Sequence, residues 1–332
     1  MNILLIGGTG NLSTDCAARL LQLGHRVLAL TRGHQPVQDG CVPLVADRKD
    51  RAAMAAALKS ENVDAAVNFL GFDVPDVELD HAVLAGRVAQ YVFISSTTVY
   101  AIPHRNLPLT EQSPLGNPFW DYARKKQACE EWLMEKYRSD RFPVTIVRPS
   151  HTYSCHWMPN PISSGDYTLP ARMAKGLPVF VPDQGATPWT LTASSDFAVG
   201  LCGLVGNPAA VGETFHITSD EALTWVEIYT ETARAIGVEH PDIRRIPTEF
   251  ICEVWPLMVS KLKGDKAEPG VFDNTKIKRF VPEFQCRKSF REGIAESAQW
   301  FRADPARQRV NAESDAMIDR VIGAWDERQR DA

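Results

Sequence analysis

The chain has 332 residues, of which 44% are hydrophobic and 23% are charged, and its formal net charge is −5. This length and composition predict an ordinary globular protein with one large domain or two interleaved ones, and the negative charge gives no general attraction to nucleic acid or to an anionic membrane. No apolar run is long enough to span a bilayer, no signal peptide is visible, and the seven cysteines lack paired spacing, so we expect a cytoplasmic protein without a disulfide framework.

The first residues are typical of a strand, a glycine-rich turn and a helix. Residues 3–6 form an apolar run that predicts a buried strand, and the sequence GGTGNLS follows it. A helical pattern comes next, Gly24 is placed to end it, and residues 25–31 predict a second strand. Glycines in such a turn let the backbone approach a pyrophosphate, which the free N–H groups of the helix N-terminus stabilise. We therefore expect a dinucleotide to be bound by Gly7, Thr9, Gly10, Asn11 and Leu12. Ser13 takes the place of the last glycine of the usual pattern and is small enough for close packing.

The end of the second predicted strand bears on the choice between NAD and NADP. NAD sites usually have an acid there, which binds the ribose 2′-hydroxyl. This chain has Thr31, Arg32 and Gly33 instead, and Arg32 is able to pair with a 2′-phosphate. The alternative is an exposed loop arginine. The sequence therefore favours NADP, with NAD as the alternative.

Strands and helices continue to alternate along the first half of the chain. Three more buried strands are expected at residues 42–46, 64–69 and 91–94, with helices between them, one capped by Asp50 and one over residues 77–89. Such alternation predicts an α/β fold, a Rossmann-type doubly wound parallel sheet that binds ligands at the carboxyl ends of its strands. These ends carry Asp47, Arg48, Leu70 and Gly71, which we expect at the cofactor.

Tyr122 and Lys126 are four residues apart in a predicted helix, so their side chains share one face. A phenol titrates near about pH 10, and an ammonium or a nicotinamide cation beside it favours the phenolate. Tyr122 is therefore a candidate proton acceptor for an alcohol undergoing oxidation. The alternative is a solvated helix that carries one aromatic residue.

The glycine turn, the stretch SSTTVY at residues 95–100 and the Tyr122–Lys126 pair occur in the order found in short-chain dehydrogenases/reductases. The chain length and the stretch RPSHTY at residues 148–153 resemble the extended branch, the NAD-dependent epimerase/dehydratase family, and the resemblance covers roughly residues 1–300. It implies that Ser96 and Tyr122 are catalytic, with Tyr122 as the acid/base, and that Lys126 binds the nicotinamide ribose.

The same resemblance implies further contacts and an assembly. Asp47 falls at the adenine-contacting acid of the family, and Pro149 and His151 fall in the segment that packs against nicotinamide. Relatives of this kind are homodimers, which implies a dimer through the helices near residues 77–89 and 122–137.

The chain lacks residues that are typical of several subgroups of the family, and their absence reduces the number of reactions that it is expected to catalyse. Thr97 and Thr98 stand where sugar dehydratases carry an Asp-Glu pair, and the glutamate of sugar decarboxylases is missing too. Cys129, three residues past Lys126, is expected to pack in the core rather than to act as the cysteine of a reductive epimerase. We therefore expect an enzyme with nucleotide-sugar 4-epimerase-like chemistry through a keto intermediate. The alternative is an NADPH-dependent carbonyl reductase of a small molecule.

The second half of the chain predicts a smaller, interleaved substrate domain. Residues 154–190 are rich in proline and aromatic residues, which suits a substrate loop and lid. Thr98 and Trp189 are candidate substrate contacts, although Trp189 could instead fill the subdomain interface.

The expected domains interleave along the chain. Residues 1–153, with a return at about 190–218, are expected to bind the dinucleotide. Residues 154–189 and 219–310 are expected to bind the substrate, and residues 311–332 are expected to form a C-terminal helix. We also expect a helix from Asp196 to Gly206, a strand at 213–217, a helix at 224–236, a charged loop at 261–270 and a final helix at 312–325.

The sequence also bears on two other kinds of site. His151, Cys155 and His156 lack zinc-type spacing, so no metal site is expected. Residues 31–33 and 271–284 are also similar to chloroplast RNA-binding relatives on the same scaffold, and a non-catalytic binding protein is therefore an alternative. The chain is acidic and shows no basic stripe interleaved with aromatic residues, so a small-molecule partner, such as a nucleotide sugar, is expected over nucleic acid or a membrane.

Overall fold

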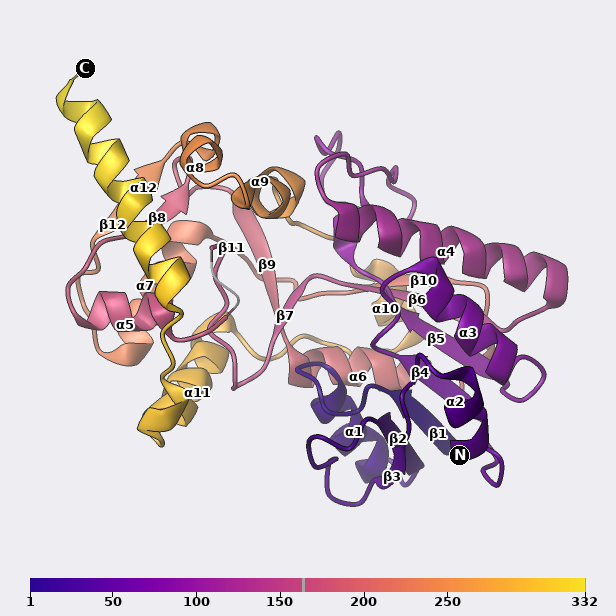
Figure 1. Cartoon of the computed structure of the whole chain (residues 1–332). Coiled ribbons are helices and arrows are strands. Elements are labelled where there is room, and N and C mark those ends of the chain that lie inside the picture. The colour runs from indigo at the N-terminus through magenta and orange to yellow at the C-terminus, as the bar shows by residue number, and fades with distance from the viewer. Residues whose placement is uncertain (163–164, 332) are drawn as a thin grey trace.

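A seven-stranded parallel sheet forms the centre of the N-terminal part of the chain (Figure 1). The computed structural model of the chain describes residues 1–162 and 165–331. The strand order is β10-β6-β5-β4-β1-β2-β3. The strands are β1 (Asn2–Ile6), β2 (Arg26–Thr31), β3 (Val42–Val45), β4 (Ala65–Asn68), β5 (Gln90–Ile94), β6 (Val144–Pro149) and β10 (Thr214–Ile217). The order reverses beside β1, which creates a crevice at the carboxyl ends of β1 and β4. The predicted Rossmann-type doubly wound sheet is therefore confirmed.

Helices cover both faces of this sheet (Figure 1). The side chains of β1 alternate between the faces, as in any strand. Ile3 and Leu5 pack in one buried cluster with residues of α1 (Ser13–Gln22), α6 (Ser194–Leu204) and α10 (Thr275–Phe280). Leu4 and Ile6 pack in the other with residues of α2 (Arg51–Ala57), α3 (Val74–Leu84) and α4 (Asp121–Asp140).

Local signals in the sequence set most helix ends. The helix α1 stops at Gln22, and Gly24 follows with φ of +78°, a conformation that favours glycine. Asp50 caps α2 by accepting hydrogen bonds from two backbone N–H groups, as predicted. The predicted helix over residues 77–89 is wrong at both ends. Its proline-containing first turn begins at Val74, and the chain leaves the helix after Leu84, before a left-handed glycine at position 86.

A second unit with its own core lies on the other side of the molecule (Figure 1). Its strands are β7 (His151–Tyr153), β8 (Val179–Pro182), β9 (Pro188–Ala193), β11 (Ala222–Thr224) and β12 (Ile243–Ile246). Its helices are α5 (Thr168–Ala174), α7 (Trp225–Ile236), α8 (Thr248–Val254), α9 (Met258–Lys261), α11 (Phe290–Arg302) and α12 (Ala312–Arg330). Short turns of helix occur at η1 (Thr97–Val99), η2 (Pro208–Ala210), η3 (Leu262–Lys266) and η4 (Pro305–Arg307). Residues 163–164 of the expected substrate loop and residue 332 lie outside the described chain.

Several details of this second half differ from expectation. The predicted charged loop at 261–270 is wrong in part, because η3 is a π-helical turn that continues α9. Side chains of Ile277, Val281 and Phe284 pack into the core of the first unit, although their range was expected in the substrate domain. The helix α12 places Ile318 and Val321 in the core of the second unit and runs to Arg330, beyond the predicted end. None of the described helices has the length and apolar character needed to cross a membrane.

Candidate active site

A cleft of about 590 Å³ opens at the carboxyl ends of β1, β2, β3 and β4. Its wall brings together residues that are far apart in the sequence. They are Gly7, Thr9, Gly10, Asn11, Leu12, Ser13, Leu30, Thr31, Arg32, Ala46, Asp47, Arg48, Lys49, Phe69, Leu70 and Phe72. Most of the residues predicted to bind the cofactor therefore line one cleft, and Gly71 lies in the same loop as Leu70.

The glycine turn in this cleft fits the pyrophosphate of a dinucleotide. Gly7 has φ of +91°, and a Cβ at Gly8 would stand 2.9 Å from the Cβ of Ala29, so the turn packs tightly on β2. No side chain caps the first turn of α1, which leaves backbone N–H groups facing the cleft. The Oδ1 atom of Asn11 is buried and has no hydrogen-bond partner in the described chain, while its Nδ2 donates to the carbonyl of Thr152. The residues present therefore suit the group that the sequence predicted.

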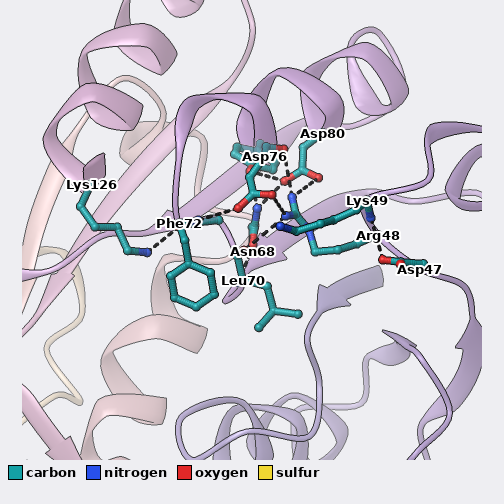
Figure 2. Close-up of polar contacts among 11 residues, drawn as sticks. Asp47, Arg48, Lys49, Asn68, Leu70, Phe72, Asp76, Asp80 and Lys126 are labelled. Atoms are coloured by element: carbon teal, nitrogen blue, oxygen red, sulfur yellow. Dashed lines mark hydrogen bonds and ion pairs between the residues drawn. The ribbon is translucent and has the colours of Figure 1, made fainter. Parts of the chain in front are cut away.

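Charged groups surround the far end of this cleft, where the adenosine would lie. Arg32, Asp47 and Lys49 are exposed there, and β2 ends in Thr31 rather than in an acid. Arg48 was predicted to bind the cofactor and lines the cleft, but it is only 7% exposed. Figure 2 shows its side chain directed toward Asp76 and Asp80. Both terminal nitrogens of its guanidinium are engaged by protein groups, so its charge is compensated within the protein.

A second cavity of about 440 Å³ lies between the two units. Its lining residues come from the chain segment after β5 with η1, the start of α4, β7, the loop after β7, α9 and η3. They are Ser96, Thr97, Thr98, Trp120, Tyr122, Ser150, His151, Trp157, Asn160, Pro161, Lys261, Asp265 and Lys266. Of the predicted site residues, Ser96, Thr98, Tyr122 and His151 meet in this cavity. Pro149 is buried at the end of β6 and lines neither cavity.

Ser96 and Tyr122 form the polar pair of this cavity. The Ser96 oxygen accepts hydrogen bonds from the backbone N–H of Thr98 at 3.2 Å and from the Thr98 hydroxyl at 3.0 Å. Its own proton is thus free to be donated to the phenol oxygen of Tyr122. Burial raises the pKa of Tyr122 to about 12, although the Ser96 hydrogen bond acts in the opposite direction. Burial therefore outweighs the groups that favour the phenolate in the protein without cofactor, and the phenol is protonated.

Lys126 is buried between the loop that carries Leu70 and Phe72 and the ring of Tyr122. Its side chain is 2% exposed, and its ammonium donates to the carbonyls of Gly71 at 2.7 Å and Ile94 at 2.6 Å. The ammonium also lies 5.1 Å from the centroid of the Phe72 ring. Burial lowers the pKa of Lys126 to about 8. An ammonium has three donors, so one is left for a ligand such as a ribose hydroxyl.

A buried ionic network fixes the elements that carry these residues. Glu130 lies one turn beyond Lys126 in α4 and pairs with Arg148 of β6 at 2.5 Å. Glu130 also accepts a hydrogen bond from Ser95, the neighbour of Ser96. Arg148 donates further to the hydroxyl of Tyr100 at 2.9 Å. The network ties α4 to the ends of β5 and β6, so Tyr122 and Ser96 are presented by one rigid frame.

Sequence reasoning missed the contribution of α9 and η3. Asp265 is buried in the cavity wall and pairs with Lys266, whose ammonium also lies 4.4 Å from the Trp189 ring centroid. The side chain of Lys261 makes no hydrogen bond or ion pair within residues 1–162 and 165–331. Besides Tyr122, the wall of the cavity therefore carries Asp265, Lys261 and Lys266 as titratable groups. The charged stretch KLKGDK was visible in the sequence, but nothing local placed it beside Tyr122.

Three other expectations concern packing and metals. Trp189 is 3% exposed and stacks on Trp225 at 5.6 Å between ring centroids, so it fills the core of the second unit rather than the substrate cavity. Cys129 is fully buried against the central sheet, as predicted. Among the described residues, no three His, Cys, Asp or Glu side chains are grouped so that they could hold a metal ion.

Comparison with known proteins supports a dinucleotide-dependent enzyme fold for this chain. The family model described as NAD dependent epimerase/dehydratase family matches residues 76–218. The chain is 26% identical over 290 residues to 2′-dehydrokanamycin reductase of Streptomyces kanamyceticus, covering 86% of this chain and 81% of that protein. It is 27% identical over 265 residues to chloroplast stem-loop binding protein of 41 kDa b of Arabidopsis thaliana, covering 75% of this chain and 67% of that protein. In fold it is similar to a solved UDP-glucose 4-epimerase of Thermotoga maritima, with a TM-score of 0.73, 16% identity and coverage of 91% of this chain and 99% of that one.

The segment matched by the family model contains the ordered set Ser96, Tyr122 and Lys126 and the strand β10 that completes the sheet. The sheet order and the glycine turn agree with this match. The match to the NAD dependent epimerase/dehydratase family covers residues 76–218, and these similarities indicate an enzyme.

Proposed function

We propose that the protein is an NADPH-dependent oxidoreductase that reduces a ketone on a sugar ring to a secondary alcohol, with Tyr122 as the proton donor. The observation that carries this proposal is the Ser96–Tyr122 pair in the wall of the cavity between the two units. The phenol is protonated there and Ser96 is held as a hydrogen-bond donor by Thr98. A ketone requires both groups, because its oxygen gains negative charge and then a proton during reduction.

In the proposed reaction the ketone oxygen lies between the Ser96 hydroxyl and the Tyr122 phenol. When bound, the nicotinamide supplies the hydride to the carbonyl carbon. Ser96 stabilises the developing oxyanion, and Tyr122 transfers its proton to that oxygen. Lys126 donates its remaining N–H to the nicotinamide ribose and, by its charge, stabilises the tyrosinate that is left.

The proposed preference for NADP rests on the adenosine end of the cleft. An acid that would bind a 2′-hydroxyl is replaced by Thr31 at the end of β2. Arg32 and Lys49 place two exposed cations at the same end of the cleft, which suits a 2′-phosphate. Asp47, which the sequence predicted to contact the adenine, is exposed beside them.

The proposed substrate carries an anionic group, as a nucleotide sugar does. Two lysines line the cavity, and among the residues that the structure describes only Lys266 has an acidic partner, Asp265. The unpaired Lys261 gives the described wall an excess of positive charge next to Trp120 and Trp157. Aromatic and hydroxyl-bearing side chains suit the faces and hydroxyls of a sugar, and a lysine suits a phosphate.

The sequence ranked 4-epimerisation first, and the same residues support that chemistry too. The protonated phenol and the reductase relative that covers most of both chains favour net reduction. The purified protein should be mixed with NADPH and a panel of keto sugars and nucleotide keto sugars, and the absorbance of reduced nicotinamide recorded. We expect net consumption of NADPH in proportion to product. Interconversion of two sugars without net absorbance change would show an epimerase instead.

The likeness to a chloroplast stem-loop binding protein keeps a binding function as the other class to be tested. The net charge of −5 and the complete set of Ser96, Tyr122 and Lys126 disfavour it. A salt-sensitive affinity for RNA stem-loops, together with no turnover in the keto-sugar panel, would replace the enzymatic proposal.

A further inference from the structure

The loop between β4 and α3 is held by buried side chains at three consecutive residues (Figure 2). The N–H of Leu70 donates to Oδ1 of Asn68 at 2.6 Å, and the Leu70 carbonyl accepts from Arg48 at 3.3 Å. The carbonyl of Gly71 accepts from Lys126 at 2.7 Å, and the N–H of Phe72 donates to Oδ2 of Asp76 at 2.9 Å. The backbone of residues 70–72 is therefore fixed from beneath, although it forms no helix or strand.

Arg48 is the centre of the cluster that fixes this loop. Its guanidinium pairs with the carboxylate of Asp76 at 2.5 Å and with that of Asp80 at 3.0 Å, and it also donates to the Asp76 carbonyl at 2.9 Å. The two acids are buried on the first turns of α3. One cation thus connects the end of β3 with the beginning of α3 and with the loop at Leu70. Neutral side chains in place of Arg48 would leave two buried carboxylates without their cation.

Tyr91 and Asn68 complete the cluster on the side of the sheet. The hydroxyl of Tyr91 donates to Asp80 at 2.7 Å, and Nδ2 of Asn68 donates to Asp80 and to the Tyr91 oxygen. Asp80 therefore receives three donors in a site without water access. Because each of these side chains is bonded to at least two other residues, the cluster is a rigid support rather than a mobile surface group.

This support presents two large apolar side chains to the cleft. Leu70 is 37% exposed and Phe72 is 48% exposed, although both belong to residue types that are usually buried. Leu70 lies against the glycine turn, where a Cβ on Gly7 would stand 2.5 Å from its Cγ. Phe72 lies beside the ammonium of Lys126. The loop thus spans the path from the glycine turn to the lysine that faces Tyr122, which is the path of the nicotinamide half of a dinucleotide.

We propose that Arg48 is a positioning residue: its buried cluster with Asp76 and Asp80 fixes residues 70–72 as the wall against which the nicotinamide half of the cofactor binds. Arg48 does not bind the adenosine half itself. This inference rests on the proposed use of a dinucleotide. It differs from a direct contact of Arg48 with adenosine, which would affect both halves of the cofactor. It also differs from a purely structural cluster, which would affect stability and no ligand selectively.

The two halves of the cofactor can be measured separately. Calorimetric titration with NADP and with adenosine 2′,5′-bisphosphate reports the whole molecule and the adenosine half. For Arg48→Met and for Asp76→Asn we expect affinity for NADP to fall about tenfold or more, while affinity for the adenosine bisphosphate stays within about twofold of the wild type. Lys49→Met is the matched control, because Lys49 is the exposed neighbour in the same cleft. Lys49→Met should lower the affinities for NADP and for the adenosine bisphosphate by a similar factor.

Asp76→Asn keeps the size of the side chain and an acceptor for the Phe72 N–H, so it is the variant to use if Arg48→Met does not fold. Amide hydrogen exchange of the wild-type protein gives a reading without any mutation. The N–H groups of Leu70 and Phe72 should exchange slowly, because Asn68 and Asp76 hold them.

Equal loss of both ligands in the Arg48 or Asp76 variant would overturn the inference, as would fast exchange of these two amides. Wild-type affinities for both ligands left unchanged by Asp76→Asn would also contradict it. In each of these cases the proposed reductase activity would stand, since the wild type binds NADP. If the wild type bound neither ligand, the proposed function would fail and the inference with it.

Discussion

The ammonium of Lys126 donates a hydrogen bond of 2.7 Å to the carbonyl of Gly71, a residue 55 positions earlier in the chain. This bond joins the helix that carries Tyr122 to the loop that lines the dinucleotide cleft. The catalytic and cofactor-binding halves of the proposed site are therefore connected through one buried cation. Changes at Lys126 should affect cofactor binding and proton transfer together, which distinguishes it from Ser96 and Thr98.

The pKa of Lys126 gives a prediction for the pH dependence of binding. Burial lowers this pKa to about 8, so the folded protein loses the ammonium proton at lower pH than the unfolded chain does. Between about pH 8 and about pH 10 the unfolded chain binds more protons, and this group therefore adds to stability as pH rises. Affinity for the anionic cofactor should change in the opposite direction and fall by up to about tenfold per pH unit above about pH 8.

Titration of the free protein with NADP over this pH range checks the assignment. Lys126→Met is the comparison, because it retains the length of the side chain and loses the titrating group. The Lys126→Met variant should bind NADP more weakly at neutral pH. Its affinity for NADP, plotted against pH, should show no inflection near the wild-type pKa of about 8. An inflection that persists in Lys126→Met would assign the titration to another group.

Arg32 should determine the choice between the two nicotinamide cofactors. Arg32→Ala removes one of two cations at the adenosine end and should weaken NADP by about tenfold to a hundredfold, since a charge-assisted contact to phosphate contributes roughly 1–3 kcal/mol. Affinity for NAD should change little. Arg19→Ala is a suitable control, because Arg19 is a cation of α1 that does not line the cleft. Parallel loss of NAD and NADP in Arg32→Ala would contradict the proposed preference.

Lys261 should recognise an anionic substrate group. Lys261→Met is expected to raise KM for a nucleotide keto sugar by about tenfold, with a much smaller effect on kcat, because the contact is made in the ground state and the transition state alike. A neutral keto sugar should show no such increase. If KM rises by the same factor for both substrates, Lys261 has a structural role and the proposed anionic substrate class is wrong.

The N-terminal half was well predicted from sequence because its signals are local. A glycine turn, buried strand runs and caps such as Asp50 depend on neighbouring residues, and the parallel sheet follows from their alternation. The cofactor cleft could be anticipated for the same reason, since strand ends meet at one edge of the sheet. The ion pairs of Arg48 with Asp76 and Asp80 could not be predicted, because the sequence does not specify which side of their helix faces Arg48.

The substrate cavity could not be predicted in the same way. Tyr122 and Asp265 are brought together only when the second unit folds against the first, and no periodicity relates α4 to η3. Trp189 illustrates the same limit, because its large aromatic side chain suits a sugar or a core equally well. The presence of Trp225 as its stacking partner decided between them. Tertiary packing, rather than local propensity, therefore determines which residues of the second half face the substrate.

The central claim is that the Tyr122 phenol is the proton donor of a hydride-transfer reaction. Tyr122→Phe removes only the hydroxyl and keeps the ring, which packs 5.2 Å from the Trp120 ring centroid. Steady-state reduction of a keto sugar, measured by NADPH absorbance beside calorimetric titration with NADP, tests it directly. We predict that kcat falls by about a hundredfold to ten-thousandfold while NADP affinity stays within about twofold of the wild type. Full activity of Tyr122→Phe would contradict the account.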